Sequence, residues 1–272
     1  MSKRKTTQKK TAPKKPTQKQ PTQQQPVNSP ITNIILNENA TGLNTALWVK
    51  EVANNSYGCT VSDKYLLNNM PALRFELRNT DPIVDGSKRA EIYRKTPESP
   101  LEEHTYIFST LLPTGGDEDF AYDPKSCDII AQWHNVPDPG EKWTMPPLML
   151  QVWNREYDVV RVWDDAPLST DESILAKGNM KEYTVGKIDG DKGRWVTWRF
   201  HVKWGWLASQ GPKLEVYKDG VKVLDLNGLP NTTNDKTGVC QKLGIYKPDW
   251  ADNPKISVVK KRIVYYNGVS VI

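Results

Sequence analysis

Two side chains capable of acid–base and hydrogen-bond chemistry lie two residues apart in the stretch 128–135, which reads Asp-Ile-Ile-Ala-Gln-Trp-His-Asn. Its β-branched and aromatic residues favour a strand, in which successive side chains point to opposite faces. The expected faces are Ile130, Gln132 and His134 on one side, and Ile129, Ala131 and Trp133 on the other. An amide and an imidazole on one face could bind a carboxylate and transfer a proton.

A lysine and a tyrosine form a second candidate pair. In the stretch 241–247, alternation places Lys242 and Tyr246 on one face. A positive charge close to a tyrosine lowers the pKa of its phenol, so Lys242 could prepare Tyr246 for proton transfer. Arg89, in the expected strand 88–94, adds a guanidinium that could neutralise an anionic group.

Basic side chains alternate in two other expected strands. Arg74 lies in the stretch 72–78, where charged and apolar residues alternate. The stretch 194–205 places valine, tryptophan and phenylalanine on one face and three basic side chains on the other. These three are Arg199, His201 and Lys203. If all these faces line one concave sheet, they form a cationic groove for a narrow anionic ligand.

An acidic polysaccharide fits such a groove. The chain has 10 tryptophans, and we expect Trp133 to offer a flat apolar surface on which a sugar ring could stack. A uronate polymer is cut by β-elimination when an enzyme neutralises the carboxylate, removes the C5 proton and protonates the leaving oxygen at C4. Arginine, lysine or an amide can stabilise the developing charge, and histidine or tyrosine can transfer the protons.

Each candidate also has a purely structural interpretation. A single histidine or tyrosine in a β-protein is most often structural, and a basic row is often the solvated face of an outer strand. Arg74 with Glu76, and Arg89 with Glu91, could be cross-strand ion pairs. Periodicity and spacing alone therefore support an all-β domain with a groove for an anionic ligand.

Strands are the elements that must position these residues. From residue 31 onwards, short segments rich in β-branched and aromatic residues alternate with turns, and no long helix is indicated. This pattern predicts a single all-β sandwich or jelly roll over 31–272, with its first strand at Ile31–Asn37. A hairpin is expected at 214–224, turned by Asp219-Gly220. Two further expectations are a long polar loop or a short hairpin at 164–192 and a tight turn at Asn267-Gly268.

The first 30 residues differ from the rest of the chain. They hold eight of the 37 basic residues and none of the 32 acidic ones, and they are otherwise mostly Gln, Thr and Pro. Such a segment buries too little apolar surface to offset its ordering entropy, so we expect a disordered tail at 1–30. This tail is either a solvated linker or a basic arm that touches nucleic acid, a virion component or another anionic surface. The rest of the chain carries 29 basic against 32 acidic side chains, a net charge of −3.

Neither a secretory signal nor a membrane span is indicated, because no stretch has the apolar length that either requires. The three cysteines, Cys59, Cys127 and Cys240, lack metal-ligand spacing, although one pair could form a disulfide. We therefore expect no metal site and no cofactor; a structural calcium ion is compatible with the fold but not indicated. We also expect a monomer.

Six segments, in order, resemble the heparin lyase I-type polysaccharide lyases and the related glucuronan lyases. They read Arg-Phe-Glu-Leu-Arg (74–78), Lys-Arg-Ala-Glu (88–91), Tyr-Ile-Phe-Ser-Thr-Leu-Leu-Pro (106–113), Gln-Trp-His (132–134), Trp-Val-Thr-Trp-Arg-Phe-His-Val-Lys-Trp (195–204) and Lys-Leu-Gly-Ile-Tyr-Lys (242–247). The resemblance covers everything but the tail. It implies a concanavalin A-like jelly roll with an open groove on its concave sheet, and eliminative cleavage of uronate polysaccharides.

The same resemblance implies roles for individual residues. His134 and Tyr246 would share the acid and base roles, in an order that depends on the sugar's C5 configuration. Lys242 would support Tyr246 or contact the substrate, while Gln132 and Arg89 would neutralise the carboxylate. The further groove contacts would be Arg74, His201 and Lys203.

Two features depart from the family's usual pattern, namely the missing secretion signal and the basic tail. Because the substrate is an extracellular polymer, we expect another export route or carriage on a particle such as a phage or virus. The net charge of −3 favours glucuronan or alginate over heparin. The alternatives are a non-catalytic lectin-like module and a virion structural protein. A glycoside hydrolase would need paired carboxylates that the strands do not show.

Overall fold

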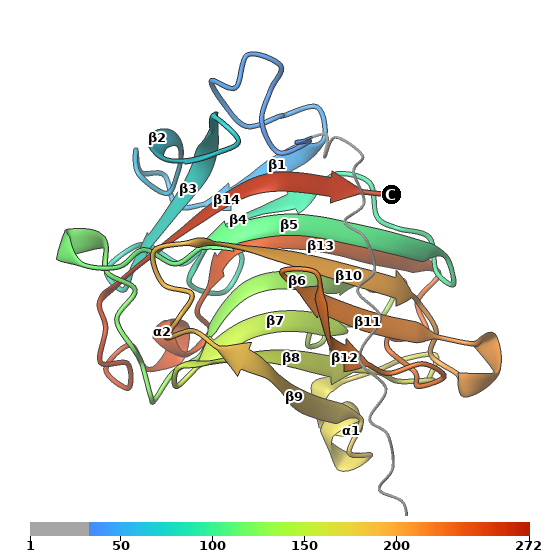
Figure 1. Ribbon diagram of the computed structural model, residues 1–272. Helices are drawn as coiled ribbons and strands as arrows, with labels where there is room; N and C mark the ends of the chain where they lie inside the picture. Colours follow the sequence, from blue (N-terminus) through green and yellow to red (C-terminus); the bar gives the residue numbers. More distant parts are fainter. Residues whose placement is uncertain (1–32) are drawn as a thin grey trace, which may run out of the picture.

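The computed structural model describes residues 33–272, which form two antiparallel sheets of seven strands each, packed face to face (Figure 1). The predicted all-β sandwich is therefore confirmed, while the tail expected at 1–30 lies outside the described residues. Sheet I contains, in spatial order, β1 (Trp48–Val52), β4 (Arg89–Arg94), β13 (Thr237–Tyr246), β6 (Asp128–Val136), β7 (Leu148–Trp153), β8 (Glu156–Val162) and β9 (Met180–Lys187).

Sheet II and a few short helices complete the described fold. In spatial order, the strands of sheet II are β12 (Val221–Asp225), β11 (Lys213–Lys218), β10 (Trp195–Lys203), β5 (Glu103–Leu111), β14 (Lys261–Val271), β3 (Met70–Arg78) and β2 (Cys59–Leu67). The helices are η1 (Gly116–Glu118), α1 (Asp171–Ala176), η2 (Ala208–Gln210) and α2 (Asp249–Asp252). None of the helices in the described residues is long and apolar enough to cross a membrane.

The core lies between the two sheets and follows from the alternation in their strands. In β10 the buried side chains are Val196, Trp198, Phe200 and Val202, as the sequence predicts. The ring of Phe200 lies 4.7 Å from that of Trp133, which comes from sheet I. Removing a buried aromatic ring of this kind costs about 3–5 kcal/mol of stability, so these contacts hold the sheets together.

The hairpin expected at 214–224 is present as β11 and β12. Its turn residues Asp219 and Gly220 both have positive φ angles, 49° and 80°. This is the geometry of a two-residue turn whose twist matches that of the flanking strands.

Three expectations about the strands are wrong. No strand covers the described part of 31–37, where Leu36 forms only an isolated bridge with Leu43. The region 164–192 contains α1 and β9, which pairs with β8, rather than one long loop or a short hairpin. Asn267-Gly268 makes no tight turn, because Asn267 donates hydrogen bonds to the carbonyl oxygens of Met70 and Pro71 while β14 runs on.

The strand that carries Gln132 and His134 contains a bulge. Its register with β7 shifts between Ile129 and Ala131, so strict alternation fails at this point. Ile130 packs in the core together with Ala131 and Trp133, whereas Ile129 joins a smaller apolar cluster on the outer face, which is the face turned away from sheet II. The expected faces of Ile129 and Ile130 are therefore exchanged, but those of Gln132 and His134 are unaffected.

The three cysteines are free thiols, with Cys59 and Cys127 buried and Cys240 half-buried. The disulfide that the sequence left open does not form.

Candidate active site

Five of the predicted site residues meet on the outer face of sheet I, on three neighbouring strands. Arg89 comes from β4, Lys242 and Tyr246 from β13, and Gln132 and His134 from β6. In the sheet register Lys242 lies opposite Gln132, and Tyr246 lies opposite Arg89. Strands far apart in the sequence therefore bring these side chains together.

A glycine lets β4 and β13 approach closely at this point. Gly244 lies opposite Glu91 and has a φ angle of 141°. A Cβ atom here would lie 2.3 Å from the carbonyl oxygen of Ala90, which is far inside van der Waals contact. The site geometry thus depends on the absence of a side chain at residue 244.

Acidic side chains balance the basic groups of the site. Nζ of Lys242 donates a hydrogen bond to Oε2 of Glu51 at 2.7 Å, and Nη1 of Arg89 lies 3.4 Å from the same oxygen. Nη1 of Arg89 also lies 3.7 Å from the buried carboxyl of Glu91. The expectation of a cationic groove is therefore wrong at this point, because two acids from β1 and β4 match the two bases.

Buried polar atoms without partners gather beneath these ion pairs. Nε2 of Gln132 donates to Oε1 of Glu91 at 2.6 Å. Within the described residues, Oε1 of Gln132, Oε2 of Glu91 and Nε of Arg89 have no hydrogen-bond partner. Burial raises the pKa of Glu91, although Lys242 and Arg89 act against this shift. Unsatisfied polar atoms are costly to bury, so this group is the part of the sheet best suited to receive a polar ligand.

His134 is held as a neutral imidazole with one nitrogen available. Its Nδ1 lies 3.1 Å from the backbone oxygen of Asn135. Because a carbonyl oxygen can only accept, Nδ1 carries the proton and Nε2 keeps its lone pair. Burial, together with the positive charges of Lys242 and Arg89, lowers the pKa of His134 to about 4. At neutral pH the residue is therefore equipped to accept a proton.

The pKa of His134 predicts a pH dependence of stability. The folded protein binds this proton with a pKa of about 4, whereas an unfolded histidine binds it at about 6.5. As the pH falls from about 6.5 towards 4, the unfolded state takes up the proton first, so stability is lost. We expect the free energy of unfolding of the His134→Gln variant to fall less over this range than that of the wild type. Parallel urea titrations at several pH values measure the free energy of unfolding of both proteins. If this free energy changes with pH equally in both, the neutral imidazole is contradicted.

Tyr246 packs under a guanidinium rather than beside an ammonium. The guanidinium carbon of Arg89 lies 4.7 Å from the centre of the Tyr246 ring. Lys242 instead contacts Glu51 and lies 5.7 Å from the ring centre of Tyr93. Arg89, and not the Lys242 expected from the spacing, is therefore the cation that contacts the Tyr246 ring.

The structure adds an exposed tryptophan that the sequence did not single out. Trp143 is 64% exposed, and its ring centre lies 5.0 Å from the imidazole of His134 in an edge-on arrangement. Its loop is fixed by a carboxylate, because Glu141 accepts hydrogen bonds from the backbone N–H groups of Asp138 and Ser169. Trp143 thus offers the flat apolar surface beside the site.

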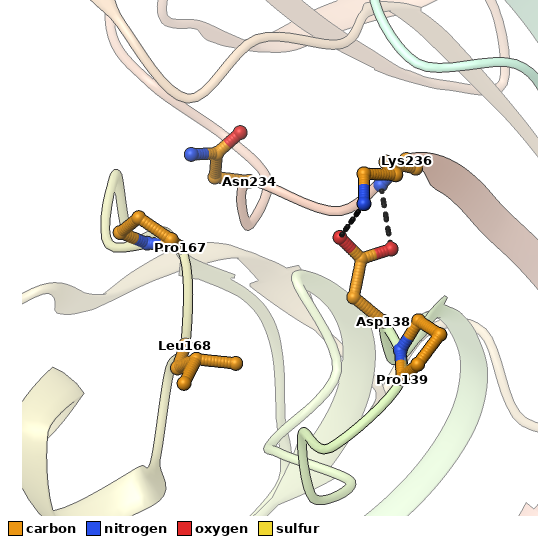
Figure 2. A pocket seen from close by; sticks show the side chains of 6 residues that line it. All are labelled: Asp138, Pro139, Pro167, Leu168, Asn234 and Lys236. Carbon is orange, nitrogen blue, oxygen red and sulfur yellow. Dashed lines mark hydrogen bonds and ion pairs between the residues drawn. The ribbon is translucent and has the colours of Figure 1, made fainter.

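A cavity of about 350 Å³ lies beyond the end of β6, between the loops that follow β6 and precede β13 (Figure 2). One wall carries the ion pair between Asp138 and Lys236, with 3.8 Å between Oδ2 and Nζ. Pro167 and Leu168 face this pair from the opposite side (Figure 2). The cavity thus combines one ion pair with the apolar side chains of two prolines and a leucine.

Comparison with known families shows to which family the chain belongs. A family model described as polysaccharide lyase matches residues 38–270. The chain belongs to the polysaccharide lyase family. No curated protein matches the sequence.

Solved structures of other lyases share the fold of this lyase. Endo-β-1,4-glucuronan lyase from the fungus Trichoderma reesei superposes with a TM-score of 0.63 at 19% identity, over 83% of this chain and 94% of that one. Alginate lyase A1-II′, a member of polysaccharide lyase family 7, gives 0.56 at 15% identity, over 83% and 94% of the two chains. Alginate lyase Aly36B gives 0.53 at 16%, over 88% and 95%. These similarities confirm the predicted jelly-roll sandwich.

The remaining basic residues predicted for the groove lie elsewhere in the lyase. They are on the outer face of sheet II and therefore on the opposite side of the sandwich: Arg74, Arg199, His201 and Lys203. Arg74 pairs with Glu76 and Glu118, and His201 pairs with Glu103. The ion-pair interpretation fits Arg74 with Glu76, and none of the four residues contributes to the face that carries His134.

Trp133 cannot stack on a sugar, because its side chain is completely buried between the sheets. Its ring lies 5.2 Å from Tyr106 and 4.7 Å from Phe200. The residue next to Gln132 and His134 is therefore part of the core of the lyase.

Proposed function

We propose that this lyase cleaves a uronate-containing polysaccharide by β-elimination on the outer face of sheet I. The observation that carries the proposal is the meeting of Arg89, Lys242 and the amide of Gln132 on three neighbouring strands, flanked by a neutral imidazole and a phenol. The similar structures include a glucuronan lyase and alginate lyases, which supports a uronate polymer as the substrate class.

In this proposal the uronate carboxylate binds over Arg89 and Gln132. The guanidinium of Arg89 and the amide of Gln132 donate hydrogen bonds to the carboxylate oxygens, which lowers the cost of placing negative charge at C5. Glu91 orients the amide through the 2.6 Å hydrogen bond to Nε2. Lys242 adds positive charge from the neighbouring strand.

Two groups on either side of Gln132 then move the protons. Nε2 of His134 accepts the C5 proton, and the electron pair of the C5–H bond forms the new C4–C5 double bond. The bond from C4 to the glycosidic oxygen breaks, and the phenol of Tyr246 donates a proton to that leaving oxygen. Exchange with water restores the imidazole and the phenol. His134 takes the base role because burial keeps it neutral.

The balanced charge of the site favours polymers of low charge density. Glu51 and Glu91 match Arg89 and Lys242, so few positive groups remain for sulfates. Heparin, the substrate of one family in the sequence resemblance, is therefore the least favoured of the uronate polymers.

A spectrophotometric assay tests this function. The enzyme is incubated with glucuronan, alginate, hyaluronan and heparin, and the ultraviolet absorbance of the new C4–C5 double bond is followed. We expect a signal from at least one of these polymers and none from the His134→Ala variant. If all four polymers stay intact but bind, the lectin-like alternative replaces the lyase.

A further inference from the structure

One cross-strand row on the outer face of sheet I leads from the candidate active site to a second cavity. Tyr246 lies opposite Ile129, Ile129 opposite Gln151, Gln151 opposite Asp158, and Asp158 opposite Thr184. Three strand spacings therefore separate Tyr246 from Asp158, a distance of roughly 14 Å. A polymer chain that crosses the strands at Tyr246 reaches this cavity a few sugar rings later.

The second cavity has an exposed aromatic wall. Its volume is about 250 Å³, close to the lower end of the range for small-ligand sites. Trp153 stands at its rim with 42% of its surface exposed. The other lining residues are Asn154, Glu156, Asp158, Glu182 and Thr184. An aromatic ring next to hydrogen-bonding groups can hold one face and the hydroxyl edge of a sugar.

The polar lining of the cavity consists largely of hydrogen-bond acceptors. Asp158 is only 4% exposed, and within the described residues its one hydrogen bond comes from Oγ1 of Thr184 to Oδ1, at 2.7 Å. Glu182 accepts from Nε2 of Gln151 at 3.0 Å. Burial and the neighbouring Asp158 raise the pKa of Glu182. Each carboxylate oxygen can accept more than one hydrogen bond, so a ligand that donates hydrogen bonds suits this lining.

A sugar hydroxyl fits this lining better than a uronate or a metal ion does. No lysine or arginine is among the lining residues, so a uronate here would bring its charge against three acidic side chains, which opposes binding. In the described part of the chain, no group of three or more metal-ligating side chains is arranged to hold a metal ion. The cavity therefore selects an uncharged ring that donates hydrogen bonds.

We propose that this cavity binds an uncharged sugar residue of the same polymer that is cut at Tyr246, so that the substrate is a heteropolysaccharide in which uncharged sugars separate the uronates. The inference rests on the proposed function and narrows it, because a homopolymer of uronates would place a carboxylate in the cavity.

Cleavage of two classes of polymer tests the inference. The alternating polymers are hyaluronan and unsulfated chondroitin, and the homopolymers are glucuronan and alginate. We expect kcat/KM to be about tenfold higher for an alternating polymer than for either homopolymer. The alternating polymer avoids the repulsion between a uronate carboxylate and the acidic lining of the cavity. The Asp158→Asn/Glu182→Gln double variant should shift this ratio about tenfold towards the homopolymers, because it removes the repulsion. A matched control is Glu103→Gln on sheet II, which should leave the ratio unchanged.

A binding measurement separates this inference from the proposed function. Affinity electrophoresis of the Tyr246→Phe variant, in gels that each contain one polymer, measures polymer binding without cleavage. We expect an alternating polymer to retard the protein, and Trp153→Ala in the same background to weaken binding about fivefold to tenfold. If the enzyme cleaves none of the polymers, the proposed function is overturned. Retardation of the protein by an alternating polymer would still support binding of a sugar in the cavity. Stronger retardation by glucuronan or alginate, retardation by neither class, or no effect of Trp153→Ala would overturn the inference.

Discussion

The Tyr246→Phe variant is expected to lose kcat by about 10²–10⁴-fold, which is the usual contribution of general acid–base catalysis. The substitution removes one hydroxyl group and keeps the ring, which packs under Arg89 and joins the apolar cluster with Ile129 and Met149. The KM and the melting temperature should therefore stay close to those of the wild type. Steady-state kinetics on the polymer that is cut fastest, together with thermal unfolding, measure these quantities.

A matched variant on the neighbouring strand controls for the loss of a phenol from this face. Tyr93 lies opposite Lys242 in the sheet register and is half-buried. The proposed mechanism gives it no proton to transfer, so Tyr93→Phe should keep most of the activity. Full activity of Tyr246→Phe, or equal losses in the two variants, would remove Tyr246 from the mechanism.

The Gly244→Ala variant is expected to lose much of its stability. Its Cβ would lie 2.3 Å from the carbonyl oxygen of Ala90 and 2.6 Å from Cα of Glu91. Backbone strain and steric overlap each cost about 1–3 kcal/mol, so we expect a loss of about 3 kcal/mol or more. For a domain of this size that corresponds to a Tm lower by roughly 6–12 °C. Activity should fall as well, because Glu91 and Tyr246 flank the displaced backbone.

Gly220 provides the control for this prediction. Its φ angle of 80° is also positive, but a Cβ atom there meets nothing within 4 Å. Gly220→Ala should therefore cost only the conformational penalty of about 1–2 kcal/mol. Calorimetry of both variants separates strain from overlap. A Gly244→Ala variant no less stable than Gly220→Ala would show that β4 and β13 can move apart at no cost.

Local patterns in the sequence were sufficient to predict several strands and their buried faces. The alternation in 194–205 identified the buried face of β10, and Asp219-Gly220 identified the hairpin of β11 and β12. Both depend on contacts within a few residues of the chain. The β-bulge at Ile129 was missed because it arises from pairing with β7, and such pairing leaves no local signature.

Alternation could not tell which sheet a polar face belongs to. Arg199 and Gln132 both lie on faces opposite the core, and only the strand order places them on opposite sides of the sandwich. For the same reason the charge balance of the site was missed. Glu51 neutralises Lys242 across 191 residues of sequence, and neither residue type alone predicts that pairing.

The aromatic platform was assigned to the wrong residue for a related reason. Trp133 adjoins Gln132 and His134 in sequence but points into the core, whereas Trp143 reaches His134 through the loop that follows β6. A tryptophan in a polar loop next to a candidate site was the available signal for Trp143.

The mass balance of one cleavage reaction tests the central claim most directly. A defined oligosaccharide of the preferred polymer is digested to completion, and the product masses are measured by mass spectrometry. β-Elimination adds no water, so the masses of the two products should sum to that of the substrate, and one product should carry the unsaturated uronate. Products whose masses sum to the substrate plus one water would show hydrolysis and would contradict the roles of His134 and Tyr246.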